Sequence, residues 1–212
     1  MVMILIMKGF CLMKRLMLLF IIGFMTFFII ACDLEQRPND DETPTQLTTP
    51  LTDALTLDLD YEGKTFTEDG IGEVTLQRCI DGDTTRFYED GVALEQSVRY
   101  LGIDTPETWR NPSEPWADAA SDYVCDVLQN AETIVLERNF DGPLYETYGR
   151  YLAFVWADGR LLNLELIELA YAHAVGASNL KYGDEMMQAW FNAMETGRRI
   201  HGERDPDYPY DD

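Results

Sequence analysis

Five short segments in which apolar and polar residues alternate most constrain what this chain can fold into. Alternation with a period of two residues is typical of strands that bury one face. Asp90-Gly91, between the second and third segments, indicates a tight hairpin turn. The predicted strands cover residues 73–80, 84–88, 94–103, 133–137 and 151–156.

Helical patterns lie between the third and fourth strands and after the fifth. Pro115 opens a predicted helix that runs to about residue 129, and Asn163 is the expected cap of a helix to about residue 171. A last helix covers about 184–199 and ends on two arginines. This order predicts an α+β fold, a five-stranded OB-fold-like β-barrel with about three α-helices. OB folds often bind nucleic acids or oligosaccharides, but a fold alone does not establish a function.

The N-terminal residues read as an export signal. Lys14-Arg15 precedes an uncharged apolar run from Leu16 to Cys32, which has the length of a signal-peptide core. The run ends in Ile29-Ile30-Ala31-Cys32, which resembles the bacterial lipobox. We therefore expect residues 1–31 to be a lipoprotein signal peptide, with a lipid on Cys32 that holds the protein at the cell membrane, outside the cytoplasm. An uncleaved anchor helix is the alternative, and Met13 is a second candidate start.

Residues 32–60 have the composition of a linker. They are rich in Thr, Pro and acidic residues and have almost no aromatic residues. Such a segment buries too little apolar surface to order itself, so we expect a flexible acidic spacer. The folded domain is then predicted to cover residues 61–212.

Composition excludes several classes of protein. The chain has 16 basic and 38 acidic residues, and residues 61–212 hold 12 and 30 of them, a balance of −18. This balance disfavours a protein that coats nucleic acid through a broad basic surface. Four cysteines are too few for a disulfide scaffold, and two histidines leave little material for His-based metal sites.

Three charged motifs and one arginine carry the chemistry of the predicted domain. Each has an ordinary interpretation on its own, because Asp-Gly mostly marks a turn and a charged loop residue is usually solvated. Their order and spacing together indicate a site. They are Asp81-Gly82-Asp83-Thr84, Arg99, Asp104-Thr105-Pro106-Glu107-Thr108 and Tyr148-Gly149-Arg150.

The residue types in these motifs suit a metal ion and a phosphate. The carboxylates of Asp83 and Asp104 and the backbone carbonyl of Thr105 form an all-oxygen donor set, which favours Ca²⁺ over zinc. Arg99 and Arg150 are planar and permanently charged, and their donors match phosphate oxygens in pairs. Positive charge of this kind stabilises the transition state of phosphodiester hydrolysis.

Taken together, the motifs resemble those of the staphylococcal-type thermonuclease (micrococcal nuclease) family, over about Val74 to Gly202. The resemblance implies a Ca²⁺-dependent endonuclease of low specificity that leaves 3′-phosphate ends. Its expected substrates are single-stranded or locally unpaired DNA and RNA, and we expect a monomer. A catalytically silent OB-fold module that binds nucleic acid or protein is the alternative. Nuclease-like modules of that kind usually lose the carboxylates or the arginines, and all of them are present here. A lipoprotein whose acidic surface mainly buffers cations is a third interpretation, but it leaves the arginines unexplained.

The resemblance also implies a role for each matched residue. Asp83, Asp104 and the Thr105 carbonyl would hold Ca²⁺, and Asp81 would lie beside this metal site. Glu107 would act as the general base or orient the attacking water.

Three further residues match the family's substrate contacts. Arg99 and Arg150 would bind the phosphate, and Arg150 would also assist the leaving 5′-oxygen. Tyr148 matches a tyrosine that contacts the nucleotide phosphate. The chain departs from the family at Thr147, where a lysine is usual.

A second departure concerns base stacking. Two family tyrosines that flank the nucleotide base fall near Gly176 and Ser178. Base stacking would then depend on a substitute, for which Tyr145 and Tyr182 are the candidates, and weaker substrate binding is expected.

Two cysteines lie within the predicted domain. Cys79 is on the first strand and Cys125 is on the first helix, which should pack nearby. In an exported protein these two residues either form a disulfide or remain two small buried apolar side chains.

Overall fold

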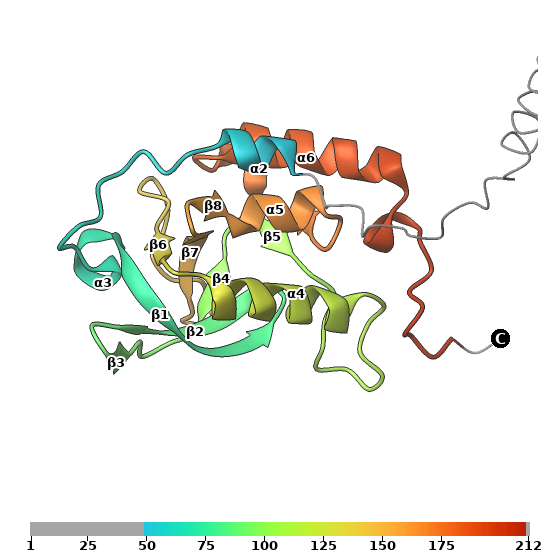
Figure 1. The fold of residues 1–212 in the computed structure, drawn as a ribbon, viewed down its shortest axis with the longest axis horizontal. Helices are drawn as coiled ribbons and strands as arrows, with labels where there is room; N and C mark the ends of the chain where they lie inside the picture. The colour runs from blue at the N-terminus through green and yellow to red at the C-terminus, as the bar shows by residue number, and fades with distance from the viewer. Residues whose placement is uncertain (1–48, 211–212) are drawn as a thin grey trace, which may run out of the picture. The chain divides into compact units, whose positions relative to one another are not determined.

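The computed structural model describes residues 49–210, drawn in colour in Figure 1. Five helices and nine strands make up this part of the chain, with two short 3-10 turns at Ala177–Asn179 and Arg199–His201. The helices are α2 (Pro50–Ala54), α3 (Phe66–Asp69), α4 (Ala117–Asn130), α5 (Leu162–Glu168) and α6 (Gly183–Thr196). The strands are β1 (Ile71–Asp81), β2 (Thr84–Glu89), β3 (Val92–Ala93), β4 (Val98–Tyr100), β5 (Ile103–Asp104), β6 (Ile134–Glu137), β7 (Tyr151–Ala157), β8 (Arg160–Leu161) and β9 (His173–Ala174).

Five of the strands close into a barrel, in the order β1-β6-β7-β4-β2 and back to β1. Only the β4–β7 pair is parallel within this ring. The closed barrel with its helices confirms the predicted α+β, OB-fold-like class. Inward-facing side chains such as Phe87, Val98 and Phe154 are fully buried and form its core.

The strand β1 pairs with two different strands because it bends. Its first half pairs with β6 and its second half with β2. The register with β2 shifts between Leu76 and Arg78 and again between Cys79 and Asp81. Such irregularities bend a strand and increase its twist, which lets one strand close a small barrel. They also place Asp81 at the end of the bent half.

The predicted third strand, 94–103, is wrong in its extent. Asp90-Gly91 does form a hairpin turn, but it joins β2 to the two-residue strand β3. The chain then re-enters the barrel as β4 and turns at Gly102, where φ is +76°. This left-handed backbone conformation favours glycine, and a Cβ atom there would lie 2.7 Å from the Met186 methyl carbon. The following strand β5 leaves the barrel and pairs with β9.

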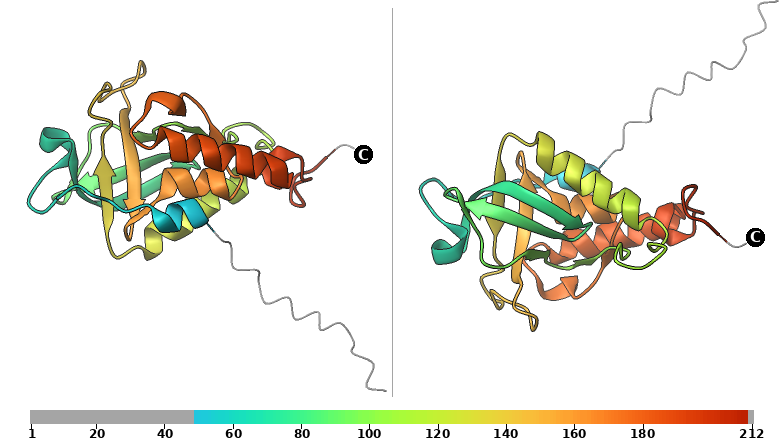
Figure 2. Two further views of the ribbon diagram at one scale, coloured as in Figure 1. Left: turned by 90° about the horizontal axis from the view of Figure 1, so that it is seen from above. Right: turned by 90° about the horizontal axis from the view of Figure 1, so that it is seen from below.

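Helices cover the barrel on separate flanks, as Figure 2 shows. The long helix α4 packs on β1, whereas α5 packs against β7, α2 and α6. Asn163 is not the cap of α5, because Leu161 occupies that position and the Asn163 side chain is fully buried. Its side chain accepts a hydrogen bond from the Val155 N–H and donates to the Leu101 carbonyl. It therefore fastens α5 to the barrel wall.

The predicted flexible spacer is wrong for residues 49–60, which pack on the folded domain. Both backbone N–H groups of Leu51 and Thr52 donate to the Glu168 carboxylate at 2.9 Å. Later in the same segment, the Asp58 carboxylate forms an ion pair with Lys181 at 2.9 Å. These charge-assisted contacts, and the leucines of the segment that pack on the core, hold residues 49–60 against the domain. Composition alone did not reveal these contacts. The signal peptide, Cys32 and the rest of the spacer lie outside the described residues.

No helix between residues 49 and 210 is long and apolar enough to cross a membrane.

Candidate active site

The turn between β1 and β2 carries the first two predicted acidic residues. Asp83 is buried, and its carboxylate accepts hydrogen bonds from the Thr84 hydroxyl and the Thr105 N–H, both at 3.0 Å. Gly82 makes this approach possible, because a Cβ atom there would lie 2.8 Å from the Thr105 hydroxyl. The turn and the Thr105 segment, 22 residues apart, are thus fastened to each other.

Arg99 on β4 joins Asp83 to Asp104. One end of its guanidinium forms an ion pair with Asp83, and Nη2 lies 2.6 Å from Oδ1 of Asp104. The same Nη2 donates to the Ile103 carbonyl at 3.1 Å. Two carboxylates, one from the turn after β1 and one from the end of β5, therefore converge on one cation, and Thr105 is the next residue in the chain. Burial limits solvent screening here, because the Arg99 side chain is only 18% exposed.

Asp81 is half-buried at the start of the same turn. Its carboxylate accepts a hydrogen bond from the Asp83 N–H at 3.2 Å. Burial raises the pKa of Asp81, and the Thr84 hydroxyl, Arg99 and Arg150 counteract this shift in part. Asp81 therefore lies within the electrostatic reach of both predicted arginines.

Arg150 is the residue directly before β7, and its side chain reaches the acidic turn. Its Nε pairs with Glu146, and Nη1 donates to the Thr84 hydroxyl at 3.2 Å. The hydrogen bond to Glu146 raises the pKa of Arg150 most, and the charges of Asp81 and Glu107 raise it further. Arg150, the acidic turn and Glu107 therefore share one end of the barrel.

Glu107 lies on a loop that closes on itself. Its N–H donates to the Glu114 carboxylate at 2.9 Å, and the Glu114 N–H donates back to the Glu107 carbonyl at 3.0 Å. These bonds hold the backbone of Glu107 and leave its half-exposed carboxylate out of the pairing. A carboxylate in this setting is available to take a proton from water.

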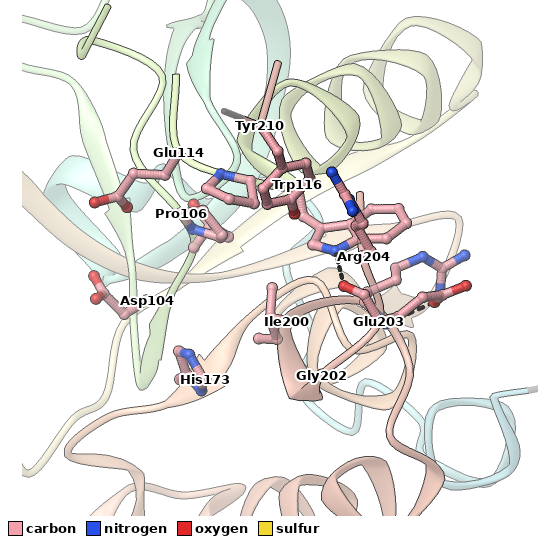
Figure 3. Close-up of a pocket in the computed structure, with 13 residues that line it drawn as sticks. Asp104, Pro106, Glu114, Trp116, His173, Ile200, Gly202, Glu203, Arg204 and Tyr210 are labelled. Carbon is pink, nitrogen blue, oxygen red and sulfur yellow. Dashed lines mark hydrogen bonds between the residues drawn. The ribbon is translucent and has the colours of Figure 1, made fainter. Parts of the chain in front are cut away.

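A cavity of about 550 Å³ adjoins the site on the side of Asp104. Figure 3 shows Asp104 and His173 at one end and Trp116 with the C-terminal segment at the other. The Trp116 indole donates to the Glu203 carbonyl at 3.0 Å, and its backbone N–H donates to Asp205. The C-terminal segment thereby forms one wall of the cavity.

The predicted metal ligands are brought together only in part. Asp83 and Asp104 converge on Arg99, and Thr105 lies beside them. Within residues 49–210, no three His, Cys, Asp or Glu side chains are placed to share one metal ion. The donors that do converge are oxygens, which fits a hard cation such as Ca²⁺.

The candidates for base stacking differ in their access to solvent. Tyr182 is buried, and its hydroxyl donates to Glu137 at 2.9 Å, so it cannot stack on a substrate. Tyr145 is half-exposed and packs against Tyr151 with 4.7 Å between ring centroids. Tyr148 is 85% exposed, two residues from Arg150. Sequence reasoning missed Glu146, because it had no way to choose the partner of Arg150 among many acidic residues.

A disulfide joins Cys79 to Cys125, with 5.7 Å between their Cα atoms. The bond links β1 to α4 two residues before Asp81. Of the two alternatives that the sequence left open for these cysteines, the structure therefore shows the disulfide.

Comparison with known proteins shows which family the chain resembles. The family described as "Staphylococcal nuclease homologue" matches residues 97–200. The chain is 35% identical over 126 residues to the thermonuclease of Staphylococcus hyicus, covering 58% of this chain and 72% of that protein. It is 37% identical over 101 residues to the thermonuclease of Staphylococcus intermedius, covering 47% and 57%. It is 37% identical over 117 residues to endonuclease YncB of Bacillus subtilis, covering 53% of each chain.

Fold, site and comparisons together define a hydrolase that acts as a nuclease. More specifically, the chain belongs to the family of staphylococcal nuclease homologues. The matched region includes Arg99, Asp104, Glu107 and Arg150 and ends in the 3-10 turn after α6. Because the chain spans little more than half of two of these relatives, its substrates are a matter for proposal.

Proposed function

We propose that this protein is an endonuclease of low specificity that hydrolyses phosphodiester bonds of DNA and RNA and leaves 3′-phosphate ends. The observation that carries the proposal is the convergence of Arg99, Arg150 and Glu107 around one acidic turn. Two guanidinium groups and one half-exposed carboxylate suit a phosphate and an attacking water.

Each residue then has a defined task. Glu107 takes a proton from water as the water oxygen bonds to phosphorus. The bond from phosphorus to the 5′-oxygen breaks, and this oxygen takes a proton from solvent while Arg150 donates a hydrogen bond to it. Arg99 and Arg150 bind the equatorial oxygens, for which they must exchange some of their present carboxylate contacts.

We also propose Ca²⁺ as the cofactor, held by Asp83, Asp104 and the carbonyl of Thr105, with Asp81 close by. The support is the all-oxygen donor set and the convergence of two carboxylates on one positive group. When bound, such an ion supplies positive charge that stabilises the phosphate oxygens in the transition state.

The test compares cleavage of heat-denatured DNA by the full-length protein in Ca²⁺ and in a chelator. We expect Glu107→Gln and Arg150→Ala to lower kcat by roughly 100-fold or more, as loss of one transition-state contact does. Glu195→Gln and Arg198→Ala are matched controls on exposed residues and should cleave normally. A folded protein that cleaves neither DNA nor RNA at any Ca²⁺ concentration would favour the silent binding module instead.

The acidic exterior predicts an unusual response to salt. A balance of −18 over residues 61–212 repels nucleic acid at long range. Salt screens this repulsion, since the Debye length falls to ~10 Å at 0.1 M. We propose that the enzyme works in salty or Ca²⁺-rich surroundings. Activity that falls steadily from low salt to ~0.5 M, as counterion release predicts for a basic binder, would contradict this.

A lipid anchor on Cys32 outside the cytoplasm and a monomeric state are part of the same proposal. The apolar run before Cys32 and its lipobox-like end support the anchor. We expect the full-length protein to fractionate with membranes and Cys32→Ser to lose lipid incorporation. Sedimentation of the detergent-solubilised protein checks the monomer.

A further inference from the structure

The loop after Glu107 holds an exposed aromatic side chain in a fixed place. Trp109 is 74% exposed, although a large apolar ring usually packs against its own protein. It follows Glu107 by two residues, a span of at most ~7 Å along the backbone. The ring is therefore exposed to solvent on the same short loop as the proposed general base.

Contacts within the loop connect Trp109 to the site. The Arg110 guanidinium lies over the Trp109 ring, 5.3 Å from its centroid, and Nη1 pairs with Glu114 at 3.0 Å. Glu114 in turn accepts the Glu107 N–H. The Ser113 hydroxyl donates to the Thr108 carbonyl across the same loop. One chain of contacts thus runs from the Glu107 backbone to the indole ring.

Tyr148 has a similar position relative to Arg150 on the loop before β7. It precedes Arg150 by two residues and is 85% exposed. The loops that carry the proposed base and the proposed phosphate ligand therefore both present an aromatic ring to solvent within two residues of that group. Among residues 49–210, the other exposed aromatic rings are Phe140, Tyr145 and Phe191.

We propose that Trp109 is a stacking platform for an unpaired base of the substrate next to the scissile phosphate. This inference rests on the proposed nuclease function. Trp109 is then a substrate-binding residue, and Arg110 and Glu114 are positioning residues that keep the ring in place. Stacking on a neutral ring suits this protein, because the contact needs no positive charge and tolerates any base.

The acidic surroundings favour a base over a lipid surface as the partner of Trp109. Glu107, Asp104 and Glu114 lie on the same stretch of chain and would be brought against anionic headgroups if the ring entered a membrane. A base face is uncharged and comes with a phosphate that the nearby arginines bind.

The experiment measures binding of fluorescent oligothymidylate to the full-length Glu107→Gln protein in Ca²⁺, so that cleavage does not interfere. We expect Trp109→Ala to weaken binding roughly 5- to 150-fold, the range of one lost stacked base. Trp109→Phe should keep most of the affinity. Phe191→Ala removes another exposed ring, 53% exposed on α6, and should change nothing. An abasic oligonucleotide should bind equally to the protein with and without Trp109.

Three outcomes distinguish a failure of the stacking role from a failure of the proposed nuclease function. Oligothymidylate that binds well but is indifferent to Trp109→Ala overturns the stacking role and leaves the nuclease function intact. No binding of any oligonucleotide by the folded Glu107→Gln protein overturns the proposed function, and the stacking role with it. A blue shift of tryptophan emission on phosphatidylcholine vesicles, lost in Trp109→Phe, assigns the ring to a membrane and also overturns the inference.

Discussion

Removing the disulfide between Cys79 and Cys125 should lower the stability of the fold much more than the cleavage activity. The two cysteines are 46 residues apart in sequence. Closing a loop of that length lowers the entropy of the unfolded chain by an amount worth about 4 kcal/mol at 25 °C. For a domain of this size, 1 kcal/mol shifts Tm by about 2–4 °C, so the double variant should melt roughly 8–16 °C lower.

The folded state gives little reason for a loss of activity at low temperature. Cys79 is paired with Thr85 in the β1–β2 ladder, and the Asp83 turn is held separately by Thr105 and Arg99. We therefore expect Cys79→Ala/Cys125→Ala to keep cleavage within about threefold of the parent at 25 °C, a loss of under ~1 kcal/mol of transition-state stabilisation.

The assay is thermal unfolding followed by circular dichroism, with DNA cleavage measured in the same preparations. Native protein incubated with reductant is the control, and it should approach the melting curve of the double variant. A Tm within ~3 °C of the parent would refute the loop-entropy argument, because it corresponds to about 1 kcal/mol or less. A 100-fold loss of activity in a folded variant would show instead that the bond positions the acidic turn.

Three further predictions follow from buried or bridging groups. Arg99→Lys keeps the charge but cannot span both carboxylates, so kcat should fall about 100- to 1000-fold, measured by steady-state cleavage with circular dichroism as the check on folding. Glu137→Ala leaves the buried Trp156 indole and Tyr182 hydroxyl without their acceptor, and at about 1–3 kcal/mol for each group urea unfolding should show a loss of about 2–6 kcal/mol. Burial and the nearby His173 lower the pKa of His201, so its contribution to stability is present above the ordinary histidine pKa and is lost as pH falls through the lowered value. Urea midpoints should therefore drop on acidification more in the parent than in His201→Phe, and equal drops would contradict the assignment.

The sequence predicted the barrel well because its cues are local. Period-two alternation marked β1, β2, β6 and β7, and Asp90-Gly91 marked the hairpin. It failed at Gly102, where the chain turns with a φ of +76° and β5 leaves the barrel to pair with the distant strand β9. Asn163 read as a cap, but its partners lie on the barrel wall, which local sequence does not reveal.

The candidate site was predicted for a different reason, namely the order and spacing of motifs that resemble those of a known family. What the motifs could not supply were the partners that lie outside them. Glu146 and Glu114 are two of many acidic residues, and only the fold selects them as partners of Arg150 and of the Glu107 N–H. The segment 49–60 likewise looked unable to order itself, because its anchors, Glu168 and Lys181, lie more than a hundred residues away.

The net charge at the site indicates a role for the proposed Ca²⁺ that does not depend on how many ligands hold it. Five carboxylates and two guanidiniums meet at this end of the barrel, a formal balance of −3. Both arginines are already paired with carboxylates, so a phosphodiester would meet net repulsion at close range. Added positive charge beside Asp83 and Asp104 would offset that repulsion and release guanidinium donors toward the phosphate. The groups are Asp81, Asp83, Asp104, Glu107 and Glu146 against Arg99 and Arg150.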